Sequence, residues 1–573
     1  MGGPSKSFPS PGTGVPMKHA PFRMAGWFLA GIFSILASGC RSWVESGLYG
    51  VTRIKSPVTY DLRHFELNKP LSEESRTRLE ELRSAEQAES IASTDVVVCK
   101  SDHSTTNVLG RVERFDALCD LTNKQTIVMV CFSGGGSRAA RMAMHSMAEL
   151  ENRYNTNYAG LGESAVPLMQ RIDAYSAVSG GSIYASLIAA GFHSTAPKKP
   201  PPDPRTGFNF LARDKRAQWI TSNLASAAAL FYVSPAHFGV VPLLLATTEW
   251  DTLNLFSRAH AYIQNNRFLF TPPRKLLTMG DLEPTPRFLF NATCVETRLP
   301  FVFTQSALHV DSDENPLTGV TYNPARDWLL DEKLLDKKSL RANALVHATT
   351  LEDIGSSPTT FPLSYAVMAS AAFPFVFNPL HLKKHNVNGA EDDDSYVRLV
   401  DGGIYDNTGV ITALELFSHL QAHHHNANRR LVLIAVNADN IITGYDQETL
   451  AKIGHFNLDI PLRGAFEAIG SMYHIYYHQT QLFRAAILAR VRDLNKGRAT
   501  PLVDYFEINL ADIQDKVLRP KIEKIKTALT IPMKQDEWLK DAVKDVLSAK
   551  RKDTGDELGD AIVKAIGTGN RND

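Results

Sequence analysis

Two apolar runs in the central part of the chain each lead through a glycine-containing turn into a helix. Residues 126–132 (TIVMVCF) are apolar without alternation, which is typical of a strand buried on both faces, and 172–178 (IDAYSAV) are expected to form a second strand. Helical stretches follow at 138–152 and, with small apolar residues, at 182–191. This repeated order of strand, turn and helix predicts a parallel sheet with right-handed crossovers.

Later apolar runs extend the predicted sheet. Further strands are expected at 287–294, 301–304, 396–400 and 431–436. A helix is expected at 365–373, closed by Pro374, because proline cannot continue a helix. The C-terminal part is mainly helical, with one strand near 505–508, and the chain has no internal repeat. We therefore expect an α/β fold with a central, mostly parallel sheet.

The N-terminus has the pattern of a secretion signal. The first 23 residues hold three Lys or Arg and no acidic residue, and an apolar run of about 14 residues follows at 24–37. A membrane span needs about 20 residues, so a cleaved signal over 1–39 fits better than a short anchor or a buried helix. Residues 36–40 (LASGC) resemble a bacterial lipobox, which implies lipidation of Cys40. Arg41 after this cysteine favours the outer membrane of the bacterial cell envelope.

Polar and proline-rich segments divide the rest of the chain. Residues 40–125 form a mixed, polar N-terminal extension, with a charged helix expected at 72–91. A proline-rich break at 198–204 precedes an insertion at 205–285. Within it, residues 217–248 contain no Asp, Glu, Lys or Arg, although Pro235 and Pro242 argue against a straight span. This stretch is either an apolar cap that meets lipid or a set of ordinary core helices.

Composition narrows the possible functions only a little. Of 573 residues, 61 are Lys or Arg and 61 are Asp or Glu, so the formal net charge is zero and nothing indicates nucleic-acid binding. Five cysteines are too few for a disulfide scaffold, and no CxxC pair suggests a zinc site. Cys99 and Cys119 either pair, if the protein is exported, or are free thiols.

The second predicted strand ends at a serine in a tight turn. Residues 177–181 (AVSGG) follow the strand and open a helix, as in a nucleophile elbow that exposes Ser179. Gly180 and Gly181 leave room for the sharp turn. Ala177 replaces the first glycine of the G-x-S-x-G pattern, and alanine is the smallest substitute. The alternative is a structural turn.

The first predicted strand ends at a glycine loop. Residues 133–138 (SGGGSR) bring Gly134, Gly135 and Gly136 to the start of a helix, where backbone N–H groups can point at an oxyanion. Ser137 completes the loop, and Arg138 either orients it or meets an anionic head group. A nucleotide phosphate loop fits less well, because the G-K-[ST] ending and the G-x-G-x-x-G spacing are absent. A plain turn is the third possibility.

A candidate base follows a later strand. Asp401 precedes Gly402 and Gly403, which let the chain turn sharply toward the same sheet edge as Ser179. A carboxylate held there can accept the serine proton directly, although Asp-Gly-Gly is also a common turn. The rival arrangement is a Ser-His-Asp triad. Seven histidines follow Asp401, and none sits in a glycine-rich loop just after a strand: His419, His423, His424, His425, His455, His474 and His478.

These three pieces, in this order, resemble the patatin-like phospholipases. The resemblance covers roughly 126–440 and includes further parts of the family pattern: Asn291-Ala292-Thr293, residues 366–379 (AVMASAAFPFVFNP) and Asp406-Asn407. It implies a three-layer α/β/α patatin-like fold. The catalytic domain would span 126–440, with the 205–285 cap inserted and a mostly helical C-terminal extension at 441–573.

The resemblance also implies roles for the candidate residues. Ser179 would be the nucleophile and Asp401 the base of a Ser-Asp dyad, and backbone N–H groups of Gly135, Gly136 and Ser137 would bind the oxyanion. No metal or cofactor is implied. The expected substrate is a phospholipid or another acyl lipid at a membrane surface, cleaved through an acyl-enzyme. The alternative function is a membrane-anchored lipoprotein that binds or tethers lipid with an inactive hydrolase fold.

Overall fold

The computed structural model describes the central sheet and the helices around it. The described residues are 70, 72–77, 104–106, 112–114, 124–158, 166–191, 207–222, 277–283, 285–305, 348–373, 379–385, 396–423, 429–438, 484, 487–525 and 531–568. All of them belong to one compact unit, Asp61–Ala228 with Trp250–Asp573. The expected signal at 1–39, Cys40, Cys99, Cys119 and residues 223–276 of the insertion lie outside the described residues.

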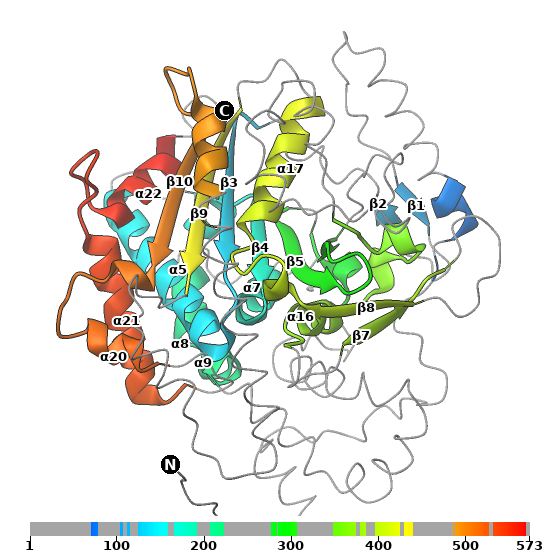
Figure 1. Cartoon of the computed structure of the whole chain (residues 1–573), viewed down its shortest axis with the longest axis horizontal. Helices are drawn as coiled ribbons and strands as arrows, with labels where there is room; N and C mark the ends of the chain where they lie inside the picture. The colour runs from blue at the N-terminus through cyan, green and yellow to red at the C-terminus, as the bar shows by residue number, and fades with distance from the viewer. Residues whose placement is uncertain are drawn as a thin grey trace, which may run out of the picture. The chain divides into compact units, whose positions relative to one another are not determined.

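Five parallel strands form the centre of an eight-stranded sheet (Figure 1). In spatial order they are β10 (Val503–Asn509), β9 (Arg430–Asn437), β3 (Thr126–Phe132), β4 (Ala174–Val178) and β5 (Arg287–Cys294). Nearly every side chain of the inner strands is buried, which explains their continuous apolar sequences. The predicted strands at 126–132 and 287–294 coincide with β3 and β5.

Three antiparallel strands complete the sheet beyond β5. They are β6 (Pro300–Phe303), which pairs with β5, and the hairpin of β7 (Leu380–Lys383) and β8 (Tyr396–Asp401), which joins β5 through β8. The sheet is therefore mixed but mostly parallel, as expected. A separate small hairpin pairs β1 (Ser104–Thr106) with β2 (Val112–Arg114).

Strands β4 and β8 meet end to end along one edge of β5. Val178, the last residue of β4, pairs with Asn291, and Asp401, the last residue of β8, pairs with Ala292. A strand has two edges, and β6 occupies the opposite edge over Phe290–Thr293, so β4 and β8 share the remaining one. The sequence suggested that β8 would end at the same sheet edge as the parallel strands. The carboxyl end of β8 does lie beside that of β4, but β8 reaches this position by running antiparallel to β5.

Helices cover both faces of the sheet and make three layers (Figure 1). Alternate residues of β3 point into two separate cores: Val128, Val130 and Phe132 into one, and Ile127, Met129 and Cys131 into the other. The larger core includes α5 (Gly136–Tyr158), α7 (Gly180–Gly191) and α16 (Leu363–Ser370). The smaller core includes α17 (Val410–His423).

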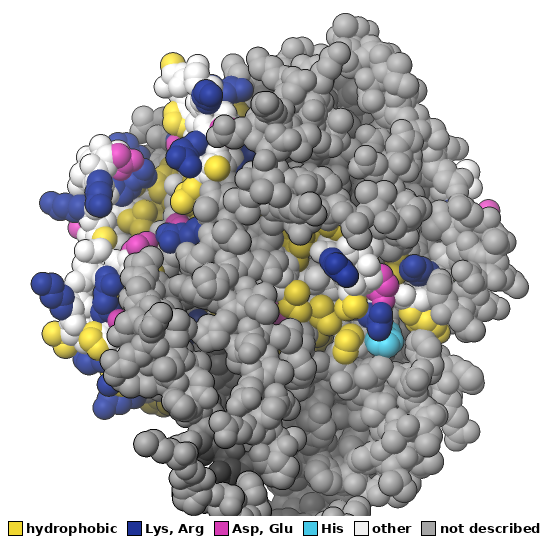
Figure 2. Space-filling view, in the orientation of Figure 1, with side chains coloured by type: hydrophobic (Ala, Val, Ile, Leu, Met, Phe, Trp, Pro, Cys, Tyr) yellow, Lys and Arg dark blue, Asp and Glu magenta, His cyan; other side chains and the backbone are white. Residues whose placement is uncertain are grey.

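The described C-terminal segment belongs to the same compact unit as the central sheet. Its strand β10 adds a parallel edge to β9, and α21 (Met533–Ser548) and α22 (Leu558–Thr568) contact α5. One face of α21 is buried in the larger core, whereas Figure 2 shows Lys and Arg side chains over the C-terminal helices. Elements from after residue 440, strand β10 and the buried face of α21, thus pack on the same sheet and in the same core as the elements before it.

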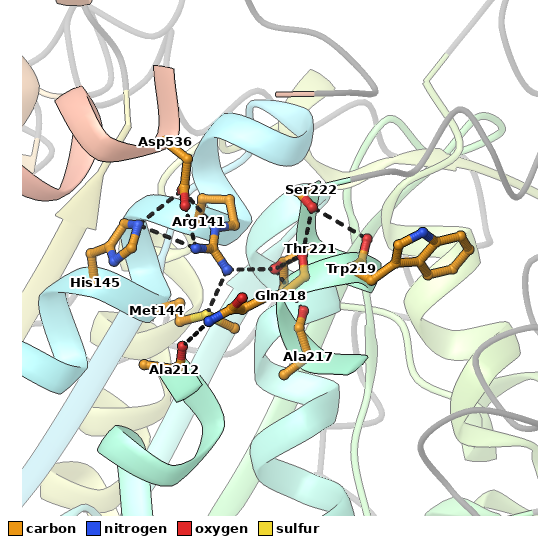
Figure 3. A network of polar contacts seen from close by, with 10 residues as sticks. All are labelled: Arg141, Met144, His145, Ala212, Ala217, Gln218, Trp219, Thr221, Ser222 and Asp536. Carbon is orange, nitrogen blue, oxygen red and sulfur yellow. Dashed lines mark hydrogen bonds and ion pairs between the residues drawn. The ribbon is translucent and has the colours of Figure 1, made fainter. Parts of the chain in front are cut away.

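A polar network fastens α5 to elements from two distant parts of the chain (Figure 3). Arg141 of α5 donates to Asp536 of α21 with its Nε (2.6 Å) and Nη2 (2.5 Å). Its Nη1 lies 3.4 Å from Thr221 Oγ1 on α9 (Lys215–Ser222), within the expected cap, and His145 lies 2.9 Å from Asp536. Burial disfavours the ionised form of Asp536 and by itself would raise its pKa. The hydrogen bonds from His145 and Arg141 stabilise the carboxylate more strongly, so the Asp536 pKa lies below its usual range.

Two short α-helices are described in the expected cap. They are α8 (Gly207–Arg213) and α9, and both contact α5. Of the charged helix expected at 72–91, residues 73–77 are helical, and residues 78–91 lie outside the described residues. Within the described ranges, no helix combines the length and apolar character needed to cross a bilayer.

Candidate active site

Ser179 occupies a strained turn between β4 and α7. Its φ of 49° lies in the left-handed region, which non-glycine residues rarely adopt and which is typical of a nucleophile elbow. The turn packs tightly on the glycine loop: a Cβ at Gly180 would lie 2.0 Å from the Gly136 carbonyl oxygen. A Cβ at Gly181 would lie 2.6 Å from the Phe132 carbonyl oxygen. Both positions therefore require glycine, as the sequence pattern suggested.

The alanine that departs from the elbow pattern fits its place. Ala177 is fully buried in the larger core and pairs with Phe132 of β3 and Phe290 of β5. It belongs to the strand and not to the turn, so its methyl group packs as an ordinary core side chain. The positive φ of Ser179 persists without a glycine at 177.

The carboxylate of Asp401 meets the hydroxyl of Ser179. Ser179 Oγ donates to Asp401 Oδ2 at 2.7 Å, although the two residues are 222 positions apart. The other carboxylate oxygen, Oδ1, accepts from the Gly403 N–H at 2.8 Å. A Cβ at Gly402 would lie 2.0 Å from the Asn291 carbonyl oxygen, so only glycine allows the chain after Asp401 to pass so close to β5.

Burial tunes the acidity of this carboxyl. Asp401 is almost fully buried, and desolvation of its charged form raises its pKa from 3.8 to about 6, against the hydrogen bonds from Ser179 and Gly403. Near neutral pH the group is mainly ionised and can accept a proton. Its raised pKa also makes it a stronger base than an exposed aspartate.

The glycine loop lies beside the serine at the start of α5. Gly135 (φ 130°) and Gly136 (φ 62°) adopt conformations that favour glycine. The first N–H groups of a helix have no acceptor within it, and the helix dipole favours negative charge there. The N–H groups of Gly135, Gly136 and Ser137 are therefore suited to an oxyanion near Ser179.

Two residues of the expected oxyanion set have other partners. The Gly134 N–H donates to the Asn407 carbonyl at 2.8 Å, so this residue shapes the loop and supplies no free donor. Arg138 is buried, and its Nη1 donates to the Ile525 carbonyl of the C-terminal segment at 3.0 Å. Of the two expected roles for Arg138, the geometry favours orientation of the loop over contact with a head group.

Three residues whose roles the sequence left unassigned surround the pair. Asn407 supports Gly134, as described above. The Thr293 hydroxyl donates to the Asp401 carbonyl at 3.0 Å and accepts from the Tyr405 N–H at 3.2 Å. Ser370 accepts from the Ser179 N–H at 3.0 Å. All three lie in segments of the family pattern, which was the only available signal.

The histidines considered for a triad are placed only in part. His419 and His423 belong to α17, and the five later ones lie outside the described residues. Among the residues that the structure describes, no cluster of three His, Cys, Asp or Glu side chains is suited to a metal ion. Cys131 and Cys294 are buried free thiols.

Comparison with known proteins identifies the family. The model of the patatin-like phospholipase family matches residues 130–414, which include the end of β3, the glycine loop, the elbow and β8. No curated protein matches. Among solved structures, VipD from Legionella pneumophila is similar at 12% identity and a TM-score of 0.26, over 82% of this chain and 72% of that one. Through residues 130–414, the chain belongs to the patatin-like phospholipase family.

Proposed function

We propose that the protein is a serine acyl hydrolase that cleaves ester bonds of phospholipids or related acyl lipids. The single observation that supports this most strongly is the 2.7 Å hydrogen bond from Ser179 Oγ to Asp401 Oδ2. It joins a hydroxyl in a strained elbow to a carboxylate whose raised pKa suits a general base. Membership of a family that acts on lipid esters supports the substrate class.

In the first half of the reaction, the Ser179 oxygen attacks the ester carbonyl while Asp401 Oδ2 takes the serine proton. The carbonyl oxygen becomes an oxyanion, which the N–H groups of Gly135 and Gly136 stabilise at the start of α5. Asp401 then returns the proton to the departing alcohol oxygen as the ester C–O bond breaks. The acyl group remains on Ser179 as an ester.

In the second half, water replaces the alcohol. Asp401 takes a proton from the water as its oxygen attacks the acyl carbonyl, and a second oxyanion forms in the same place. Its collapse breaks the bond to Ser179, which recovers its proton from Asp401, and the fatty acid leaves. Asp401 thus acts alternately as base and acid, which a pKa near neutrality favours.

The proposed site of action is a membrane surface of the bacterial cell envelope, at the outer membrane. The lipobox-like segment before Cys40 supports lipid attachment there, and several acyl chains hold a protein stably on a bilayer. The uncharged stretch at 217–248 supports an apolar cap over the acyl chain. Mass spectrometry of the mature N-terminus tests the first part: an intact, unacylated Met1 contradicts it.

Labelling with a fluorophosphonate probe tests the chemistry. We expect the folded wild-type protein to be labelled, Ser179→Ala to be inert, and Asp401→Asn to be labelled on the order of 100-fold more slowly, because its amide takes up no proton. If the folded, detergent-solubilised wild type is not labelled, the result would favour the alternative, a lipid-binding or tethering lipoprotein with an inactive hydrolase fold.

Hydrolysis assays then define the substrate. We compare the rates at which the wild type hydrolyses a phospholipid, a lysophospholipid and a soluble short-chain ester. Ser179→Ala and Asp401→Asn give the background rates. Release of fatty acid from liposomes above the background rates supports a phospholipase. Activity on the soluble ester alone would restrict the proposal to a general esterase.

A further inference from the structure

The hydroxyl of Ser370 lies at the junction of three segments behind the nucleophile. Ser370 is the last residue of α16 and is fully buried. Its Oγ lies 3.0 Å from the Ser179 nitrogen, 2.7 Å from Ser182 Oγ and 2.5 Å from the Asn291 carbonyl oxygen. It therefore touches the elbow, the first turn of α7 and strand β5 together.

The chemistry of the three partners fixes the direction of each hydrogen bond. The Asn291 carbonyl can only accept, so it takes the one proton of Ser370. The Ser179 N–H can only donate, so Ser370 Oγ accepts it. Ser182 must then donate as well, into the second lone pair of Ser370. Every donor and acceptor site of this hydroxyl is used, which leaves it a single orientation.

The same end of α16 also holds the carboxylate residue. The Asp401 N–H donates to the Ala372 carbonyl at 3.0 Å, two residues after Ser370. Backbone N–H groups of both members of the pair are thus bound by one short stretch, Ser370 to Ala372. This stretch fixes the spacing between β4 and β8, whose ends meet at Asn291 and Ala292 of β5.

We propose that Ser370 is a positioning residue, which holds the strained Ser179 elbow so that its hydroxyl stays in hydrogen-bond contact with Asp401. The proposal rests on the function proposed above. The Ser179 φ of 49° is unfavourable for a non-glycine residue and persists only where its surroundings enforce it. The bond from the Ser179 N–H to Ser370 is such a constraint. It also occupies the Ser179 N–H, so this group is no oxyanion donor.

An isosteric pair of variants isolates the hydroxyl from steric effects. Ser370→Thr keeps the hydroxyl and Ser370→Val has the same shape without it, so the added methyl group affects both equally. Ser186→Ala is the matched control, because Ser186 is a buried serine of α7 whose hydroxyl bonds to its own helix at Ile183. The measurement is the rate of fluorophosphonate labelling over a range of pH, at equal folded fraction by circular dichroism.

We expect Ser370→Val to be labelled roughly 10- to 100-fold more slowly than Ser370→Thr, since a misplaced reactive group loses about that much. The acid limb of its pH profile should also move upward, because the hydrogen bond from Ser179 lowers the Asp401 pKa and would be weakened. Ser186→Ala should match the wild type. Equal rates and equal pH profiles for the valine and threonine variants would overturn the role of Ser370.

A structural measurement decides the matter even if the valine variant does not fold or the wild type is inert. Ser370→Ala removes the hydroxyl without adding bulk. In its crystal structure we expect the distance from Ser179 Oγ to Asp401 Oδ2 to exceed about 3.5 Å, the limit of a hydrogen bond. An unchanged distance near 2.7 Å would contradict the positioning role. An inert wild type would contradict the proposed function and leave this distance as the test of Ser370.

Discussion

Replacing the buried carboxylate should make the protein more stable while removing its activity. Asp401 has a pKa of about 6 when folded, against 3.8 for an ordinary aspartate. Between these values the folded state binds more protons than the unfolded state, so stability from this group is lost as the pH rises through about 6. Above that pH, the ionised carboxylate costs up to about 3 kcal/mol.

Asp401→Asn removes this cost with little change of shape. Its side-chain oxygen can still accept from Gly403, and its amide can donate to Ser179, so both hydrogen-bond sites stay filled. We expect the free energy of unfolding to rise by up to about 3 kcal/mol at about pH 8. The gain should fall to roughly half of that at about pH 5, where part of the wild-type cost is already gone.

Urea unfolding at several values between about pH 5 and pH 8 measures this difference. Wild type and Asp401→Asn are compared at each pH, with equal m-values as the check that the unfolded states are alike. A variant less stable than wild type at the upper end of this range would refute the reasoning. So would a gain that does not change with pH, because titration of Asp401 would then have no part in it.

Three further predictions concern the strain at Ser179, the titration of Asp401, and the ion pair between Arg141 and Asp536. Ser179→Gly should be more stable than Ser179→Ala by about 1 kcal/mol in urea unfolding, because glycine adopts the positive φ without strain; equal stability would contradict a strained elbow. The pH profile of kcat/KM on a soluble ester should fall below about pH 6, since Asp401 must be ionised to act as base; a flat profile down to about pH 4 would exclude it as the base. Arg141→Met should lower the free energy of unfolding by about 3 kcal/mol, because it leaves Asp536 without its guanidinium partner. The double variant Arg141→Met with Asp536→Leu should lose less stability than Arg141→Met alone. A double-variant loss equal to the sum of the two single-variant losses would argue against this coupling.

The buried strands were accessible from sequence because burial on both faces leaves an unbroken apolar run. Thr126–Phe132 was predicted to the residue for this reason, and so was Arg287–Cys294, although its sequence (RFLFNATC) also holds buried polar residues. Strand β7 (LHLK) was missed, since it is short and its polar residues alternate with apolar ones. The antiparallel direction of β8 was also missed, because a short apolar run carries no sign of its orientation.

The candidate site was predictable where local geometry demands particular residues. Glycines at 180, 181 and 402 leave no room for a Cβ, and such demands are visible in sequence. The role of Ser370 was not visible, because its three partners come from three separate segments that only the fold joins. The occupation of the Gly134 N–H by Asn407 was hidden for the same reason.

Because β4 and β8 meet end to end on β5, the register of both strands on β5 sets the distance between Ser179 and Asp401. Ser179 and Asp401 are set by neighbouring positions on one strand, Asn291 and Ala292. A slip of β8 by a single residue would carry the carboxylate about 3.4 Å along that strand and turn its side chain to the opposite face. Activity would therefore vanish in any misaligned fold, even a compact one, so turnover reports on correct strand pairing more sensitively than compactness does.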